Sequence, residues 1–232
     1  MPSFDIIKES KPKESYRVSS VLNSFDLDID KIKEHFKGSI DIENKDWNIG
    51  LIVGGSGTGK STIAKDVFGD CFALCEYSKE AVIDDMPKSK SIKEITKAFT
   101  SVGFSSPPSW LKPYQVLSNG EKMRCDLANS ILQEKDIVVF DEFTSVVNRE
   151  VAKTGSLAIA KAIRKLNKKF VAVGCHSDIL EWLQPDWIYN TDEQRFFFAL
   201  ENTKGQISKW KSLGLGTRIK NEFGKYFRSI TI

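Results

Sequence analysis

Apolar positions along the chain follow two patterns, which predict two kinds of element. Short continuous apolar runs bounded by polar residues are typical of strands that are buried on both faces. Three such runs cover residues 48–53, 136–142 and 170–176. Apolar side chains spaced three or four residues apart predict amphipathic helices over residues 60–68, 91–102, 118–133 and 149–166. Because the strands alternate with helices, the chain is predicted to be an α/β protein with a mainly parallel sheet.

Two of these helices carry a recognisable start signal. Ser91 and Ser118 are each followed three residues later by a glutamate, Glu94 and Glu121, which is the pattern of a capping box. Gly103 is the predicted stop of the first of these helices.

The segments outside this core give weaker patterns. We expect residues 1–20 to be a mobile or edge segment, and residues 30–36 to form a short helix. Short strands are predicted at residues 38–42, 71–75, 81–83 and, at the edge of the sheet, 196–198. The expected organisation has three parts: an N-terminal segment with an edge strand (1–44), a core with a reduced helical subdomain at about 88–134 (45–192), and an edge strand with a basic, aromatic tail (193–232).

The residues after the first predicted strand carry the clearest chemistry. The phosphate-binding P-loop pattern, G-x-x-x-x-G-K-[ST], is matched by Gly54-Gly55-Ser56-Gly57-Thr58-Gly59-Lys60-Ser61-Thr62. Its glycines let backbone N–H groups turn inward around a polyphosphate, and the helix N-terminus adds partial positive charge. In such a loop Lys60 reaches the β- and γ-phosphates, and the Ser61 hydroxyl binds Mg²⁺. We therefore expect the chain to bind a nucleoside triphosphate.

A second candidate group lies at the end of the next buried strand. Val138-Val139-Phe140-Asp141-Glu142 resembles a Walker B strand, in which the aspartate holds Mg²⁺. Glu142 follows directly and is placed to act as general base on the attacking water. We expect Asp141 and Ser61 to share the metal.

Leu117-Ser118-Asn119-Gly120-Glu121 resembles the Leu-Ser-Gly-Gly-Gln signature of the ABC ATPase family. The order of the surrounding motifs agrees with that family over about residues 48–190. The P-loop comes first, then the signature helix, the Walker B strand, a D-loop at Ser145-Val146-Val147-Asn148, and a strand that ends in a switch histidine, His176.

The resemblance implies a catalytic cycle in a dimer. In ABC proteins, Ser118 and the Gly120 N–H would face the γ-phosphate held by the other subunit, so that two copies enclose two ATP molecules head to tail. His176 would contact the γ-phosphate and help hold the attacking water. The resemblance therefore implies a P-loop ATPase with Mg²⁺ and ATP, acting as a homodimer.

Several positions depart from the family pattern. The only glutamine among residues 62–116 is Gln115, two residues before the signature, so the usual Q-loop glutamine is missing from its expected place. Asn119 replaces a glycine, which we expect to be tolerated because asparagine accepts a left-handed backbone. Asn148 replaces the D-loop aspartate and Phe143 the usual proline. The family's adenine-stacking aromatic is expected at Phe25, with Phe36 and Tyr16 as alternatives.

Composition and charge limit the setting. Apolar residues make up 41% of the chain and charged residues 28%, as in an ordinary globular protein. No apolar run approaches the roughly 20 residues that span a bilayer, and the N-terminus lacks a signal peptide's apolar stretch. We therefore expect a cytoplasmic protein with reduced cysteines. Cys71, Cys75, Cys175 and His176 do not repeat the close pairs of a zinc site.

The net charge of +3 is uneven. Residues 190–232 carry eight Lys or Arg and four Asp or Glu, so the excess lies in the tail. There basic residues are interspersed with aromatic residues: Lys209, Trp210, Lys211, Arg218, Lys220, Lys225, Tyr226, Phe227 and Arg228. This pattern fits either a nucleic-acid contact or an amphipathic segment packed on the core, and we favour the second.

The shortened helical part argues against a transporter, because ABC transporters couple to their membrane domains there. The local sequence around Asp141, His176 and Trp182 is similar to that of a soluble bacterial and phage subgroup of ABC ATPases, whose members are often fused to an acetyltransferase domain. We expect an ATPase that drives a nucleic-acid process or a separate modifying enzyme such as an acetyltransferase. The alternatives are the nucleotide-binding subunit of an ABC transporter, or a P-loop kinase acting on a nucleotide or DNA base.

Overall fold

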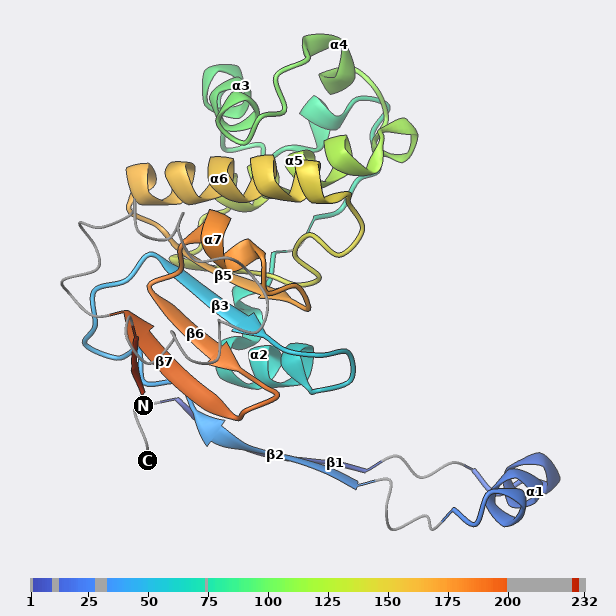
Figure 1. Ribbon diagram of the computed structural model, residues 1–232. Coiled ribbons are helices and arrows are strands. Elements are labelled where there is room, and N and C mark those ends of the chain that lie inside the picture. Colours follow the sequence, from blue (N-terminus) through green and yellow to red (C-terminus); the bar gives the residue numbers. More distant parts are fainter. Residues whose placement is uncertain (1, 10–12, 28–32, 74, 200–226, 230–232) are drawn as a thin grey trace.

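The computed structural model describes residues 2–9, 13–27, 33–73, 75–199 and 227–229 (Figure 1). Its centre is a six-stranded sheet in the order β4-β5-β3-β6-β7-β8. The strands are β3 (Ile49–Val53), β4 (Ile137–Phe140), β5 (Lys169–Gly174), β6 (Trp187–Asn190), β7 (Arg195–Ala199) and β8 (Phe227–Ser229). The first four in space are parallel, whereas β7 and β8 pair antiparallel. The predicted α/β fold with a mainly parallel sheet is confirmed.

Helices cover both faces of this sheet and create two cores. On one face lie α6 (Arg149–Leu166) and α7 (Ile179–Leu183), whose buried side chains share a cluster with Leu51 of β3. On the other face α2 (Lys60–Phe68) packs in a second cluster with Ile52. Alternate residues of one strand thus belong to opposite cores, as expected for a strand buried on both sides.

The helices α3 (Ile92–Ser101), α4 (Pro107–Trp110) and α5 (Asn119–Leu132) form a helical layer; α3 and α4 lie beyond α6, and α5 runs beside α6 and also contacts β4 (Figure 1). Both predicted capping boxes are present. Ser91 and Ser118 each accept a backbone N–H from the glutamate three residues later, and each glutamate accepts the serine N–H in return. The predicted helix over residues 149–166 is also confirmed, as α6.

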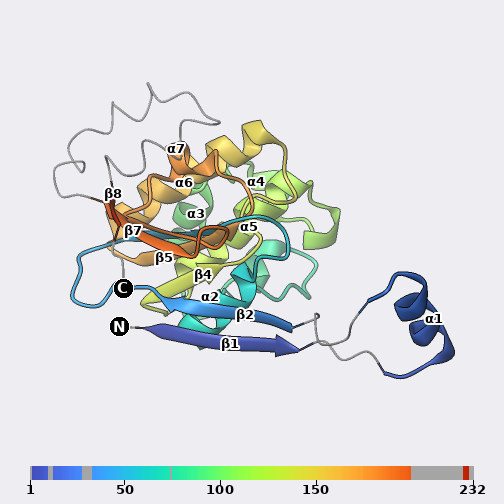
Figure 2. The same cartoon turned by 60° about the horizontal axis from the view of Figure 1, so that its bottom comes forward.

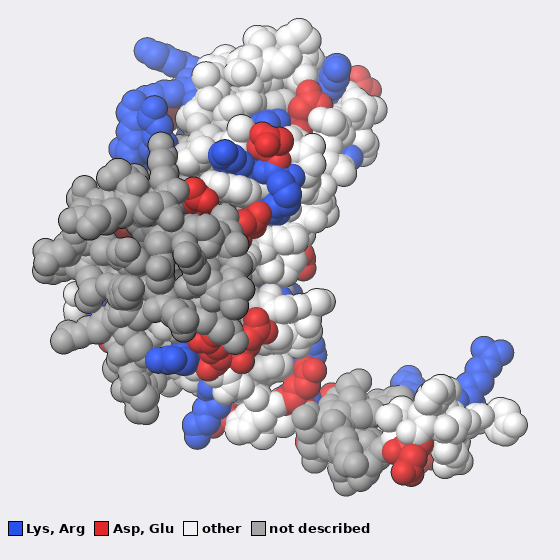
Figure 3. All heavy atoms as spheres, viewed as in Figure 1, with Lys and Arg blue, Asp and Glu red and all other residues white. Residues whose placement is uncertain are grey.

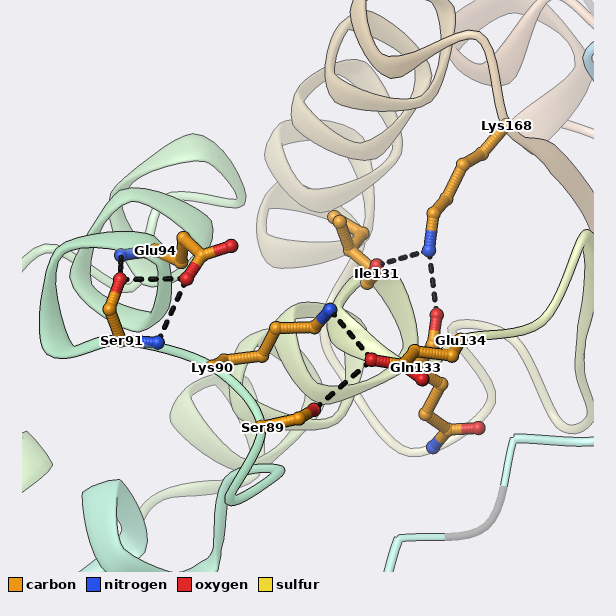
Figure 4. A network of polar contacts seen from close by, with 8 residues as sticks. All are labelled: Ser89, Lys90, Ser91, Glu94, Ile131, Gln133, Glu134 and Lys168. Atoms are coloured by element: carbon orange, nitrogen blue, oxygen red, sulfur yellow. Dashed lines mark hydrogen bonds and ion pairs between the residues drawn. The ribbon is translucent and has the colours of Figure 1, made fainter.

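The C-terminal end of α5 is held by lysine side chains (Figure 4). Lys168 Nζ donates 2.7 Å hydrogen bonds to the carbonyls of Ile131 and Gln133, which are among the groups that a helix end leaves unpaired. Lys90 Nζ and Ser89 Oγ donate to Glu134 at 3.1 and 3.2 Å. These contacts join the end of α5 to the segment before β5 and to the segment before α3.

A separate hairpin precedes the sheet. Strands β1 (Ser3–Glu9) and β2 (Lys33–Ser39) pair antiparallel. The Phe4 ring of this hairpin packs edge-on against the Tyr189 ring of β6, with ring centroids 5.5 Å apart. Between them α1 (Tyr16–Ser24) lies away from the rest of the molecule, and none of its residues is buried (Figures 1 and 2). The predicted helix over residues 30–36 is wrong where the structure describes it, because Lys33–Phe36 pairs with β1 as a strand.

Other local predictions also need correction. Residues 82–85 form a 3₁₀ turn (Val82–Asp85) instead of a strand, and the described residues of 71–75 form one isolated bridge, Phe72 to Val139, instead of a strand. The predicted strand at residues 196–198 exists as β7, but it is not at the edge because β8 pairs outside it. Further 3₁₀ turns are Gly69–Cys71 and Tyr114–Val116. The three-part division of the chain stays a prediction.

Candidate functional site

The candidate residues gather at one edge of the sheet, where the parallel strands end. The pairing registers bring Val53, Gly174 and Asn190 abreast, and Phe140 beside Ala172. The P-loop, the acidic pair and the histidine therefore leave the sheet on the same side. This carboxyl edge is where open α/β sheets bind ligands.

The P-loop is shaped by two glycines in the left-handed region. Gly57 has a φ of 80° and Gly59 a φ of 79°, which side-chain-bearing residues rarely adopt. Lys60 Nζ reaches back across the loop and donates to the Gly55 carbonyl, and the Thr58 hydroxyl donates to the same oxygen at 2.9 Å. Helix α2 begins at Lys60 with Gly59 as its N-cap, so no side chain caps its first turn. The loop can thus present backbone donors and one ammonium to an anion.

A turn after β6 supports the P-loop, and the sequence reasoning missed it. The Gly55 N–H donates to both carboxylate oxygens of Asp192, at 3.0 and 3.2 Å. The hydroxyls of Thr58 and Thr191 lie 2.6 Å apart. A Cβ on Gly54 would lie 2.0 Å from the Thr191 hydroxyl, so this position must be glycine. The available signal was that Thr191 and Asp192 follow a buried strand, as the other candidates do.

The P-loop serine and the Walker B-like aspartate meet directly. Ser61 Oγ donates to Asp141 Oδ1 at 3.0 Å, and the same oxygen accepts the Glu142 N–H at 2.9 Å. A hydroxyl beside a carboxylate is a set of hard oxygen donors, which fits Mg²⁺ bound through few protein ligands together with phosphate oxygens. Glu142 is exposed and has a left-handed backbone, with a φ of 52°. Its carboxylate is therefore open to solvent beside the candidate metal position.

His176 follows β5 on a loop that is joined to the acidic segment. The Phe143 N–H donates to the Val173 carbonyl at 2.8 Å, which holds the residue after Glu142 beside the strand that leads to His176. The side chain of Phe143 is completely buried. Proline, the residue of the ABC pattern at this position, could not make that N–H donation. His176 itself is half-buried, and its ring forms no hydrogen bond with any residue that the structure describes.

The signature-like residues lie at the start of α5, in the helical layer. Ser118 is exposed, although its hydroxyl takes part in the capping box with Glu121. Asn119 Nδ2 donates to the Val146 carbonyl at 3.4 Å, and a Cβ on Gly120 would meet Val151 of α6 at 3.2 Å. The helix start therefore adjoins the D-loop-like segment. The expectation that Asn119 uses a left-handed backbone is wrong, because Asn119 is the first helical residue of α5.

Helices α5 and α2 belong to the cores on opposite faces of the sheet. The structure therefore brings Lys60, Ser61, Asp141 and Glu142 to one edge of the sheet, whereas Ser118 and Gly120 lie at the start of α5, whose core is on the opposite face of the sheet from α2. Asn148 is the N-cap of α6, where its Oδ1 accepts the Val151 N–H at 2.9 Å.

Of the three aromatic candidates, Phe36 lies against the P-loop. A Cβ on Gly59 would be 2.4 Å from the Phe36 ring, and the ring is half-buried. Phe25 and Tyr16 are 72% and 90% exposed and lie on or next to α1, away from the P-loop (Figure 2). The preference for Phe25 is therefore not supported by its position, and Phe36 is the aromatic beside the loop.

The region where a Q-loop is expected is filled by an aromatic and thiol cluster. Tyr77 and Tyr114 stack with centroids 3.9 Å apart, and the Tyr114 hydroxyl donates to Asp126 Oδ2 at 2.8 Å. Burial raises the pKa of Cys75 and of Cys125 to about 12, so both thiols stay protonated. Gln115 is exposed on the 3₁₀ turn before α5, and the structure does not join it to the P-loop edge.

Two further expectations concern metals and the tail. Among the described residues, no group of three or more His, Cys, Asp or Glu side chains is arranged around a common metal position. The basic and aromatic tail lies outside the described residues, apart from the β8 backbone. In the described part of the chain, every helix is too short or too polar to cross a membrane.

Comparisons with known proteins identify the fold. No protein-family model matches the sequence, and no curated protein matches it either. Among solved structures, a dimeric ATP-binding cassette, MJ0796 with ADP and Pi, is 13% identical with a TM-score of 0.53, over 68% of this chain and 87% of that one.

Two structures named in connection with ABC transporters show the same likeness. CbiO1 from Clostridium perfringens, part of the ABC transporter complex cbiONQ, is 16% identical with a TM-score of 0.58, over 83% of this chain and 91% of that one. A putative metal-chelate type ABC transporter is 15% identical with a TM-score of 0.54, over 70% and 75%. At such identities the likeness is one of architecture, and this chain therefore has the P-loop α/β fold of an ABC ATPase cassette.

Proposed function

We propose that the protein binds Mg-ATP and hydrolyses it as a head-to-tail homodimer. The observation that carries the proposal is the 3.0 Å contact between Ser61 and Asp141 at the edge where Glu142 and His176 also emerge. The exposed serine cap of α5 on another layer supports the dimer, because it is free to face a second copy.

Each residue has a role that its position supports. The P-loop N–H groups and Lys60 bind the β- and γ-phosphates, and Ser61 and Asp141 hold Mg²⁺. Bound there, Mg²⁺ neutralises phosphate charge as it develops. Phe36, beside Gly59, stacks on the adenine.

Hydrolysis needs a base and an anion site for the γ-phosphate. Glu142 takes a proton from the attacking water, since its carboxylate is exposed next to Asp141. His176 positions that water and contacts the γ-phosphate. Ser118 of the partner subunit, together with the partner's Gly120, closes the site with a capped helix start, which favours anions.

The cycle of dimer closure and opening would drive a separate partner. We propose a cytoplasmic nucleic-acid process or a modifying enzyme such as an acetyltransferase, in keeping with the resemblance to non-transport ABC proteins. Figure 3 shows Lys and Arg side chains gathered over α3 and the end of α6, where Lys93, Lys97, Lys161 and Lys165 are exposed. Such a basic surface supports an acidic partner.

A second candidate function is that of the nucleotide-binding subunit of a transporter. It is favoured by the similar solved structures, two of which are named as ABC transporter components. A membrane permease as the captured partner would favour it over the first.

The decisive variant is Glu142→Gln. It removes the base but keeps the P-loop and the metal ligands, so ATP binding should persist while turnover falls by about 10²–10⁴-fold. Size-exclusion chromatography with Mg-ATP should show a stable dimer that ADP does not support. Glu150→Gln, which changes an exposed glutamate on α6, is the matched control and should turn over ATP like the wild type. A Glu142→Gln protein that stays monomeric with ATP would count against the sandwich.

The trapped dimer can also identify the partner. A pull-down with tagged Glu142→Gln protein in Mg-ATP would be scored for nucleic acid, membrane permease and soluble enzyme. Enrichment of one class relative to the same protein in ADP decides between the two candidate functions.

A further inference from the structure

The segment that follows β4, residues 141–148 with the first residue of α6, Arg149, makes two contacts around the loop that carries His176, residues 175–178. The first attachment is the 2.8 Å hydrogen bond from the Phe143 N–H to the Val173 carbonyl, in strand β5 two residues before the loop. The second is an ion pair at its far end, between Arg149 and Asp178. The same segment is thus joined to the strand before the histidine loop and to the last residue of that loop.

The Arg149–Asp178 pair has the geometry of a specific contact. Arg149 Nε donates to Asp178 Oδ2 at 2.8 Å, and Nη2 donates to Oδ1, so the guanidinium grips both carboxylate oxygens. The guanidinium carbon also lies 5.3 Å from the centre of the Trp182 ring. The two side chains are 40% and 30% exposed, so solvent screens them only in part. A forked and stacked arginine of this kind cannot be replaced by lysine without loss.

The ion pair connects the D-loop-like segment to the histidine loop. Arg149 follows the D-loop-like residues 145–148, which also adjoin the start of α5 through the Asn119–Val146 contact. Asp178 is two residues after His176. A displacement of residues 145–148 would therefore reach the histidine loop through Arg149. Neither side chain lies in the P-loop.

We propose that Arg149 and Asp178 are positioning residues that transmit dimer closure at residues 145–148 to His176. The inference rests on the proposed function, since it assigns a coupling element to the same site. A partner subunit pressing on the D-loop-like segment moves the N-terminus of α6, and the arginine fork carries that movement to the histidine loop. Hydrolysis thereby depends on closure, whereas nucleotide binding at the P-loop does not.

The experiment compares Arg149→Ala and Asp178→Asn with the wild type. We expect kcat to fall about 10- to 100-fold, because a small misplacement of a catalytic group is costly. The KM for ATP and the Kd for Mg-ATP should stay within about twofold, since the P-loop contacts are untouched. Lys153→Ala is the matched control: it removes one positive charge from an exposed position of the same helix and should leave kcat unchanged.

A charge-exchanged double variant distinguishes the proposed positioning role from a purely structural ion pair. The exchanged pair, Arg149→Asp with Asp178→Arg, should have a kcat at least about tenfold above that of Arg149→Ala. Arg149→Lys should not regain activity, because lysine lacks the forked guanidinium. Thermal unfolding of every variant shows whether it is folded. Should Arg149→Ala not fold, Asp178→Asn, which keeps the shape of the side chain, carries the test.

Three results would overturn the inference. In the first, both single variants keep wild-type kcat even if their melting temperature falls. In the second, KM and Kd rise together with the loss of kcat. In the third, the exchanged pair gives no rescue. Wild-type Mg-ATP binding and hydrolysis are measured first: their absence removes the proposed function together with the coupling, whereas normal wild-type turnover with unaffected variants removes only the coupling.

Discussion

Helices α3 and α5 begin with the same four-residue box but lie in different surroundings. Ser91 donates its N–H to Glu94 at 2.8 Å, and Ser118 donates its N–H to Glu121 at 3.0 Å. The return bonds from the glutamate N–H groups are 3.3 and 3.4 Å. By local geometry the two starts are the same helix cap.

The neighbours of the two caps differ. The start of α5 adjoins Val146 and Val151, and Glu121 accepts a further 2.6 Å hydrogen bond from the buried hydroxyl of Ser109. The start of α3 is next to Ser89 and Lys90, which bind Glu134 (Figure 4). A capping box therefore shows where a helix begins. Any role in phosphate binding must come from what adjoins it, which for α5 is the D-loop-like segment.

The largest expected difference between the two caps is in ATP turnover. Ser118→Arg places a long cation where the γ-phosphate of the other subunit is proposed to bind, and should abolish hydrolysis. Mg-ATP binding to the monomer should be unchanged, because the P-loop lies on another layer. Steady-state hydrolysis and nucleotide titration measure the two effects.

The matched variant is Ser91→Arg. Both changes remove an N-cap serine and should cost about 1 kcal/mol of unfolding free energy. Only the change in α5 should stop turnover. Equal activity of the two variants would mean that the start of α5 is no more than a helix cap.

Features set by residues close together in the sequence could be predicted from it. The buried strands and the two caps were predicted correctly, because apolar runs and serine–glutamate spacing act over a few positions. Most of strand β2 was missed, since a strand was predicted only at residues 38–42 and a helix at 30–36, because its conformation depends on pairing with β1, some 30 residues earlier. Asp192 was missed for the same reason, since its bond to Gly55 joins residues 137 positions apart. Phe36 was one of three aromatic candidates, and only the packing of the hairpin on the P-loop separates it from Phe25.

A smaller difference is expected in acid stability. Hydrogen bonds from Ser109 and Ser118 lower the pKa of Glu121 from 4.5 to about 2, whereas the pKa of Glu94 is lowered by hydrogen bonds from Ser91 and by the charge of Lys90, with no bond from a second serine. A lowered folded-state pKa stabilises the protein above the unfolded value, and this contribution is lost as pH falls toward the folded value. Stability from Glu121 should therefore disappear between about pH 4.5 and 2.

Urea unfolding of Glu121→Gln and Glu94→Gln across this range tests the difference. Glutamine keeps the box but removes the charge. The stability gap between wild type and Glu121→Gln should be widest at neutral pH and close on acidification, and it should exceed the gap for Glu94→Gln. Parallel curves for the two variants would show that the Ser109 bond adds nothing.

The smallest effect is expected at the second position of each box. Asn119 and Ile92 are the first helical residues of α5 and α3, and both side chains are exposed. Asn119→Gly introduces the glycine of the ABC signature, yet the position is helical and has no need of a left-handed backbone. Each change, Asn119→Gly and Ile92→Gly, should lower unfolding free energy by at most about 1 kcal/mol. ATP turnover should stay within about twofold for both, because the 3.4 Å bond from Asn119 to Val146 is at the limit of hydrogen-bond length. A strong gain or loss of turnover in Asn119→Gly alone would show that this asparagine, and not only the serine before it, sets α5 apart from α3.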